Sequence, residues 1–325
     1  MDATRVDLPV ESRLPSFGGA TGWLNSPALS AEDLGGKVVL VDFWTYTCIN
    51  WLRTLAYVRA WSEKYEDQGL VVVGVHTPEF PFERDTDNIR LAVKDMRVAY
   101  PVAIDSDYAV WQAFANNYWP AVYIADTEGR IRYHHFGEGA YDEQERVIQQ
   151  LLGVDGDLVS VAPDGLEVQA DWPNLESPET YLGYQQGENF ASPGGVGVRR
   201  RSAREYEPPD RLQLNHWALA GNWTIEPGLS VLNDGDGSVS FRFHARDVNL
   251  VMGPPEPGAS VPFRVLVDGE APGAAHGSDV DEEGHGAVAQ QRLHQLVRQP
   301  APIEDRTFEI TFLAPGAEVY CFTFG

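Results

Sequence analysis

The residue of this 325-residue chain best suited to chemistry is Cys48, which stands where a predicted strand gives way to a predicted helix. The apolar run KVVLVDFW (37–44) has strand length, and after Cys48 apolar residues recur at helical spacing as far as Asp67. A thiolate is a nucleophile, and the N–H groups and dipole at a helix N-terminus stabilise it. We expect a reactive cysteine; the alternative is a small apolar side chain that fills the core.

Two polar residues are expected near this cysteine. His76 and Glu79 follow the apolar strand 70–75, and functional groups gather where the central strands of an open α/β sheet end. His76 is a candidate for stabilising a thiolate or for acid–base catalysis, and Glu79 for contacting a substrate. The alternatives are a hydrogen-bonded loop histidine and a solvated carboxylate.

The elements that must position these residues predict two domains joined by a linker. Strands and helices alternate through residues 1–152, which predicts an α/β sheet with helices on both faces and a final hairpin at one side. Residues 153–180 are rich in Gly, Pro, Asp and Ser and are interpreted as a linker. Residues 181–325 contain short segments that alternate with period two, which predicts an all-β sandwich with a jelly-roll-like arrangement.

Four stretches of the first part resemble thioredoxin-like redoxins of the TlpA/ResA type: FWTYTCINW, VVGVHTPEF, YWPAVYIAD and EGRIRYHHFGEG. In the second part, SPETYLGY and ENFASPGG resemble the carbohydrate-binding-module-like domain of DipZ-type proteins. The resemblance implies that Cys48 is the attacking cysteine and that Asp42 is a buried acid that assists proton transfer. It also implies that Pro120 is a cis-proline facing the cysteine, and an X–Pro bond is where a cis peptide is tolerated.

Further residues are candidates for the same site. Thr45-x-x-Cys48 resembles the peroxiredoxin motif in which a hydroxyl orients a peroxide, although Val41 stands where that family has proline. Tyr46, Trp51 and Trp119 are expected to wall a substrate pocket; the alternative for all three is core packing.

The chain departs from the family at Trp51. The family motif is Cys-x-x-Cys, whereas this sequence has CINW at 48–51, and a dithiol cycle requires a second thiol within reach. Cys321 lies in a strand-like segment where burial is expected. Three chemistries remain. In the first, Cys48 forms a mixed disulfide with a protein or small-molecule thiol, and an external reducing thiol resolves it. In the second, a peroxide oxidises Cys48 to a sulfenic acid. In the third, Cys48 is inert and the chain binds a glycan or protein.

Composition limits the partners. The formal net charge of −24 argues against nucleic acid and anionic membrane surfaces. The longest apolar stretch, 70–75, is short for a membrane span, the N-terminus lacks the apolar core of a secretion signal, and two cysteines fit a reducing compartment. We therefore expect a cytoplasmic protein without cofactor or metal.

An acidic loop and two tryptophans of the second part are candidate ligand-binding features, each with a structural alternative. The acidic loop 276–286 is a candidate for binding Ca²⁺, although its spacing does not match an EF-hand; the alternative is a solvated surface loop. Trp217 and Trp223 are candidates for stacking on a sugar or, as the alternative, for core packing.

Overall fold

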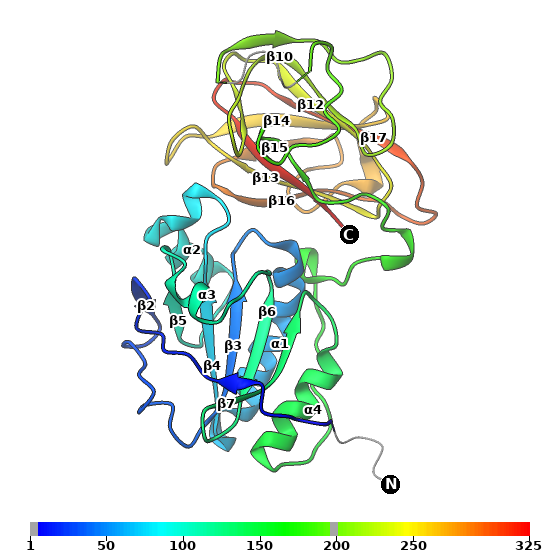
Figure 1. Cartoon of the computed structure of the whole chain (residues 1–325). Coiled ribbons are helices and arrows are strands. Elements are labelled where there is room, and N and C mark those ends of the chain that lie inside the picture. Colours follow the sequence, from blue (N-terminus) through cyan, green and yellow to red (C-terminus); the bar gives the residue numbers. More distant parts are fainter. Residues whose placement is uncertain (1–5, 196–200) are drawn as a thin grey trace. The chain divides into compact units, whose positions relative to one another are not determined.

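The computed structural model describes residues 6–195 and 201–325 and divides the chain into two compact units, Met1–Val168 and Gln169–Gly325 (Figure 1). The first unit is α/β and the second is all-β, as the sequence predicts. Each unit has its own core and is described by itself.

The N-terminal unit is built on a seven-stranded sheet with the order β1-β7-β6-β3-β4-β5-β2. Strands β3, β4 and β5 are parallel, and β6 and β7 form the predicted antiparallel hairpin beside β3. The elements in chain order are β1 (Ser12–Arg13), β2 (Gly22–Leu24), β3 (Val38–Trp44), α1 (Ile49–Tyr65), β4 (Leu70–His76), α2 (Thr86–Asp95), β5 (Val102–Ile104), α3 (Ala109–Ala113), β6 (Ala121–Ala125), β7 (Arg130–Phe136) and α4 (Tyr141–Leu152).

The central strand β3 is buried along its whole length and presents a different set of side chains to each side of the sheet. Because side chains alternate along a strand, Val41 and Phe43 face one core, which they share with Val110 and Phe114 at α3. The intervening residues, Asp42 and Trp44, face the opposite side and meet helix α1. Helices therefore cover both faces of the sheet, as predicted.

Helix α1 begins at Ile49, with Cys48 as its N-cap residue, and a short 3-10 turn at Glu66–Gln68 follows it. Gly69 ends the segment in the left-handed conformation with φ of 99°, which glycine adopts without strain. The apolar residues of the predicted helical stripe are all buried; they are Trp51, Leu55, Val58, Trp61 and Tyr65. Helix α3 is short, because the chain turns at Phe114 and Ala115, and the φ of Ala115 is 50°.

The C-terminal unit consists of antiparallel strands around an aromatic-rich core (Figure 1). Its longest strand, β10, pairs with β12 through its first half and with β9 and β11 through its second half. The strands are β8 (Thr180–Tyr181), β9 (Arg204–Tyr206), β10 (Trp217–Ile225), β11 (Ser230–Leu232), β12 (Gly237–Phe243), β13 (Asp247–Gly253), β14 (Val261–Val267), β15 (His285–Val288), β16 (Arg292–Arg298), β17 (Arg306–Phe312) and β18 (Glu318–Phe324).

The two tryptophans considered for sugar stacking lie in this core. Trp217 and Trp223 are both 0% exposed, and their indole N–H groups donate to the backbone carbonyls of Glu188 and Ala220. Neither ring is available to a ligand, so the core-packing alternative is the correct one. In the acidic loop, Asp279 pairs with Arg292, and the described residues contain no cluster of three or more His, Cys, Asp or Glu suited to a metal ion.

Within the described ranges, none of the helices combines the length and the apolar character that crossing a bilayer requires.

Candidate active site

Cys48 lies at the end of a tight turn that connects β3 to α1. Its backbone N–H donates to the carbonyl of Thr45 at 3.2 Å, and its own carbonyl accepts from Leu52 N–H at 3.0 Å, the first bond of the helix. The residue is half-buried, whereas Thr45, Tyr46 and the other residue of the turn, Thr47, are buried. The turn therefore presents a thiol at the N-terminus of a 17-residue helix, the position where backbone N–H groups stabilise a thiolate.

Trp51 occupies the position of the missing second cysteine and is completely buried. Its indole Nε1–H donates to Asp42 Oδ2 at 2.9 Å, and its ring stacks on Trp44 with 4.2 Å between centroids. The prediction that Trp51 contacts substrate is wrong, because its ring is sealed between β3 and α1. Instead, the indole supplies the hydrogen bond that a buried carboxyl needs.

Asp42 is completely buried, and burial raises the pKa of its carboxyl to about 7, against the opposing effect of Trp51 and Tyr100. Tyr100 is a residue that sequence reasoning missed. The rings of Tyr100 and Trp44 both lie close to Gly74. A Cβ at position 74 would be 2.9 Å from Trp44 Nε1 and 3.0 Å from Tyr100 Cε2, so a larger residue would displace them. The only available signal was a glycine inside an apolar strand, which marks close approach of a neighbour.

This buried carboxyl predicts a pH dependence of stability. The native carboxyl keeps a proton up to about pH 7, whereas the unfolded one releases it near pH 4. Asp42 should therefore lower the free energy of unfolding as the pH rises between these values. Asp42→Asn should remove this contribution to the pH dependence of the free energy of unfolding. Urea unfolding can be followed by the far-ultraviolet helical signal, because all described α-helices belong to this unit; parallel pH dependences of the two proteins would contradict the prediction.

His76 ends β4, directly beside Trp44 in the sheet register. Its ring is completely buried, stacks on Tyr46 at 5.6 Å and meets Trp44 edge-on at 4.7 Å. Burial lowers the pKa of His76 to about 3. A neutral, enclosed ring cannot provide the positive charge or the titration near neutral pH expected from the sequence. Tyr46 is buried against His76. Both rings therefore pack inside the unit next to the turn that carries Cys48, and neither is exposed to a substrate.

The Trp119–Pro120 peptide bond is cis, as the resemblance predicts. Pro120 is buried directly before β6, whose first residue, Ala121, pairs with Phe43 near the end of β3. Trp119 is half-buried and donates from Nε1 to the carbonyl of Thr77 at 3.1 Å. Trp119 therefore lies at the sheet end to which β3 delivers Cys48, and it keeps part of its surface accessible.

Glu79 is also half-buried, and its backbone N–H donates to the carboxylate of Glu83 at 2.7 Å. Glu83 is completely buried, and burial raises the pKa of its carboxyl while Thr45, Phe80 and Thr47 oppose the rise. Glu83 was not predicted from the sequence, because it lies in the segment FPFERD (80–85), whose charged residues are typical of a solvated loop.

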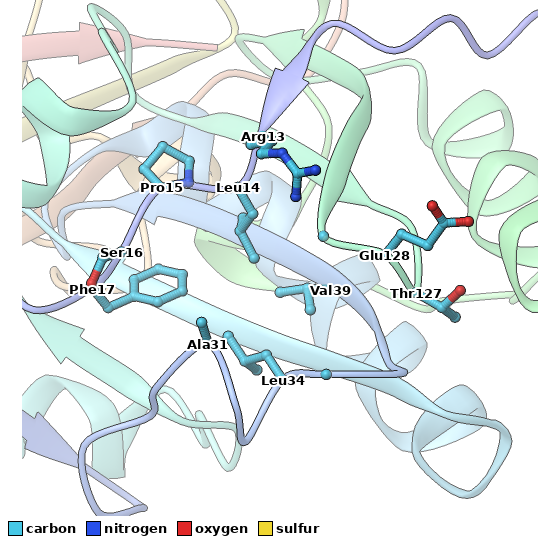
Figure 2. A pocket seen from close by; sticks show the side chains of 12 residues that line it. Arg13, Leu14, Pro15, Ser16, Phe17, Ala31, Leu34, Val39, Thr127 and Glu128 are labelled. Atoms are coloured by element: carbon cyan, nitrogen blue, oxygen red, sulfur yellow. The ribbon is translucent and has the colours of Figure 1, made fainter.

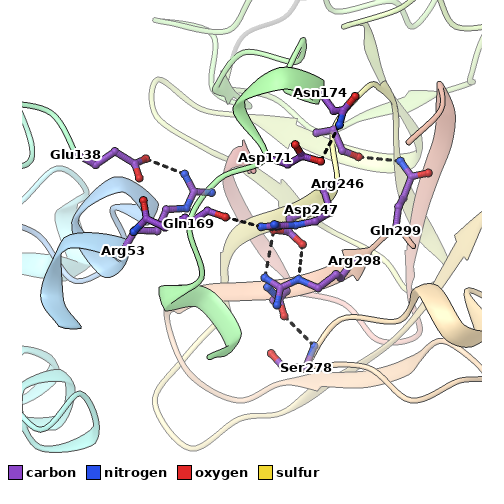
Figure 3. A network of polar contacts seen from close by, with 12 residues as sticks. Arg53, Glu138, Gln169, Asp171, Asn174, Arg246, Asp247, Ser278, Arg298 and Gln299 are labelled. Carbon is purple, nitrogen blue, oxygen red and sulfur yellow. Dashed lines mark hydrogen bonds and ion pairs between the residues drawn. The ribbon is translucent and has the colours of Figure 1, made fainter. Parts of the chain in front are cut away.

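A buried ion pair joins α1 to the loop that follows β7 (Figure 3). Arg53 Nη1 lies 2.8 Å from Glu138 Oε1, and the two side chains are 1% and 4% exposed. Burial raises the pKa of Glu138, while Arg53 counteracts the shift. The next residue back, Gly137, donates its N–H to the carbonyl of Pro120 at 2.9 Å. The ion pair therefore fixes the cis-proline segment to the helix that begins at Cys48.

Breaking this pair should be strongly destabilising. Arg53→Met leaves a buried carboxylate without its cation, which typically costs about 3–5 kcal/mol. The double variant Arg53→Met/Glu138→Leu removes both charges and should recover most of that loss. Urea unfolding followed by the helical signal measures both; equal losses in the single and double variants would contradict an effect of unpaired charge.

A cavity of about 300 Å³ lies at the other end of the sheet (Figure 2). It is lined mainly by the segments 13–17 and 127–129, together with Leu34 and Val39. Val39 is five residues before Trp44, roughly 17 Å along the strand. The cavity therefore does not belong to the cysteine site.

Two family models match the chain. "AhpC/TSA family" matches residues 10–134, and "Thioredoxin like C-terminal domain" matches residues 177–325. Among curated proteins, "Thiol-disulfide oxidoreductase YkuV" of Bacillus subtilis is 30% identical over 145 residues, which are 45% of this chain and 97% of YkuV. "Protein DipZ" of Mycobacterium bovis is 33% identical over 316 residues, 96% of this chain and 42% of DipZ.

A further match covers 142 residues that are 40% identical to "NHL repeat-containing protein 2" of Bos taurus, 43% of this chain and 19% of that protein. The α/β fold, the cysteine at the helix start and the YkuV match together define the class: the chain belongs to the thioredoxin-like thiol-disulfide oxidoreductases. Within this class it is homologous to DipZ along almost its whole length, including the all-β unit, and it spans less than half of DipZ.

Proposed function

We propose that the chain is a monothiol member of its class, in which Cys48 is the nucleophile and no second cysteine of the N-terminal unit completes the cycle. The observation that carries the proposal is the half-buried Cys48 at the N-terminus of α1 combined with a sealed tryptophan at position 51. The fold of the class is retained around the thiol, whereas the residue that would release a bound substrate is replaced.

The proposed cycle has two exchange steps. The Cys48 thiolate attacks one sulfur of a disulfide, forms a mixed disulfide with that half, and releases the other half as a thiolate. An external thiol then attacks the mixed disulfide, takes the substrate half into a new disulfide, and leaves Cys48 as a thiolate. One disulfide and one external thiol are consumed, and one mixed disulfide and one free thiol are produced.

Asp42 is proposed to assist proton transfer at Cys48. Its carboxyl accepts a hydrogen bond from Trp51, and because burial raises its pKa to about 7, it can exchange a proton near neutral pH. Glu79 and Trp119 are the half-buried side chains proposed to contact the substrate, which is a protein or small-molecule disulfide or thiol.

Cys321 is not proposed as the resolving thiol. Its side chain is 1% exposed in β18, which is paired on one side with β13 and on the other with β8. A reaction at this sulfur would require the strand to open.

Peroxide reduction is a second candidate, favoured by the "AhpC/TSA family" match and by Thr45-x-x-Cys48. In this route the thiolate attacks a peroxide oxygen, and water or alcohol leaves. One external thiol condenses with the resulting sulfenic acid to form a mixed disulfide and water. A second external thiol then attacks this mixed disulfide, releasing the Cys48 thiolate and a disulfide of the two external thiols. Both arginines of α1 form ion pairs inside the unit, Arg53 with Glu138 and Arg59 with Glu167, so neither guanidinium is free to bind a peroxide. Thiol–disulfide exchange is therefore the favoured proposal.

The two chemistries can be separated by mass spectrometry. Reduced protein is incubated with glutathione disulfide or with hydrogen peroxide, and the peptide that contains Cys48 is analysed. We expect one glutathione on Cys48, removed by excess thiol, and much slower oxidation by peroxide. Faster reaction with peroxide would favour the second candidate, and no reaction with either would leave a binding protein without redox activity.

The compartment remains the sequence-based expectation of a cytoplasmic protein. A glycan ligand for the all-β unit also remains a proposal, and it would need a surface other than the two buried tryptophans.

A further inference from the structure

The buried carboxylate of Glu83 connects the cysteine turn to the loop that follows β4. Its Oε1 accepts a hydrogen bond from Thr47 Oγ1 at 2.7 Å. Its Oε2 accepts from the backbone N–H groups of Glu79 and Phe80 at 2.7 and 2.8 Å. The side chain is completely buried and forms no ion pair within residues 6–195 and 201–325, so it does not serve to neutralise a cation there.

We propose that Glu83 is a positioning residue for Cys48, an inference that rests on the proposed function. Thr47 directly precedes Cys48, and consecutive Cα atoms are about 3.8 Å apart, so holding the Thr47 side chain restricts the backbone that carries the thiol. The same carboxylate caps the short 3-10 helix at Pro81–Arg84. A single side chain thus holds the turn that carries the nucleophile and the segment that carries Glu79.

Position matters in this chemistry because exchange requires attack on a particular sulfur with aligned orbitals. A displacement of about 1 Å can reduce the rate of an enzyme-bound reaction about 100-fold. The buried rings of Tyr46 and Phe82, whose centroids are 6.0 Å apart, also join the same two segments. They continue to hold the segments together when the hydrogen bond is removed, so we expect a partial effect.

The test uses the full chain and substitutions of Thr47. Thr47→Val preserves the shape of the side chain and the charge of the site but removes the hydroxyl. We expect the rate of mixed-disulfide formation with glutathione disulfide to fall about five- to tenfold, whereas Thr47→Ser should stay within about twofold of the parent. Thr180→Val is the matched control, because Thr180 is buried in the all-β unit and its hydroxyl donates to the carbonyl of Pro178 at 3.0 Å; its rate should be unchanged.

Glu83→Ala separates positioning from charge. If the carboxylate acted only as a negative charge near the thiolate, its removal would speed the reaction; loss of positioning slows it. We expect a slower rate, and no further loss when Thr47→Val is added, because both substitutions break the same contact. An unchanged rate in Thr47→Val, a faster rate in Glu83→Ala, or additive losses would each overturn the proposal.

The rate at which iodoacetamide alkylates Cys48, measured on the same proteins, tests the positioning role of Glu83 separately from the proposed thiol–disulfide exchange. A parent that is alkylated but forms no mixed disulfide contradicts the proposed function alone. In that case, slower alkylation in Thr47→Val still supports positioning by Glu83, and equal alkylation rates overturn it.

Discussion

Trp51→Cys should convert the chain into a dithiol oxidoreductase. Residues 48 and 51 are three apart at the start of α1, and side chains at this spacing are neighbours, with Cβ atoms about 5–6 Å apart. A small movement at the helix end brings them to the roughly 4 Å that a disulfide requires. We expect an intramolecular disulfide between positions 48 and 51, and an increase of at least about tenfold in the reduction of insulin by dithiothreitol.

The substitution also removes a large buried side chain, which typically costs about 3–5 kcal/mol, and it leaves Asp42 without its donor. Trp51→Ser is therefore the matched control, because it creates a similar cavity without adding a thiol. Peptide mapping under non-reducing conditions identifies the disulfide. If Trp51→Cys gained no more activity than Trp51→Ser, or formed only intermolecular disulfides, the proposed retention of the dithiol geometry would be wrong.

Cys48→Ser should abolish mixed-disulfide formation, with a fall in rate of at least about 100-fold. A serine hydroxyl is not ionised near neutral pH, and the thiolate is the species that attacks a disulfide. Intact-mass measurements with glutathione disulfide follow the reaction directly.

Cys321→Ser is the control for this experiment. Cys321 is 1% exposed and its Sγ contacts the carbonyl of Phe322 at 3.4 Å, so a serine has a partner there. The variant should react as the parent does. A loss of reaction in Cys321→Ser with its fold intact would instead point to a role for the second cysteine.

The α/β unit and the all-β unit were predictable from patterns that depend on few neighbours. Continuous apolar runs such as 38–44 are typical of strands buried on both faces, and the stripe from Trp51 to Tyr65 recurs at helical spacing. Period-two alternation does not reveal strand β10, because GNW interrupts the alternation and Gly221 has a φ of 90°. In that strand, pairing on both sides outweighs the local signal.

The edge of the sheet that carries the candidate site could also be predicted. Strand direction determines where β3 and β4 end, so Cys48 and His76 had to reach the same edge of the sheet. The cis bond before Pro120 followed from resemblance and was confirmed.

The roles within the site depended on packing that no local pattern contains. His76 is neutral because Trp44 and Tyr46 enclose it, and a pKa depends on solvation and neighbours. Trp51 was predicted to wall a pocket, but its indole faces Asp42 inside the unit.

The sequence alone determined that a single thiol stands at a helix start without a partner three residues later, since residue identity and spacing suffice for that. Only the tertiary structure showed that Trp51 binds Asp42, that Glu83 binds Thr47, and that Arg53 pairs with Glu138. The physical reason is that each contact joins residues from different elements, and its strength depends on the exclusion of water when those elements pack.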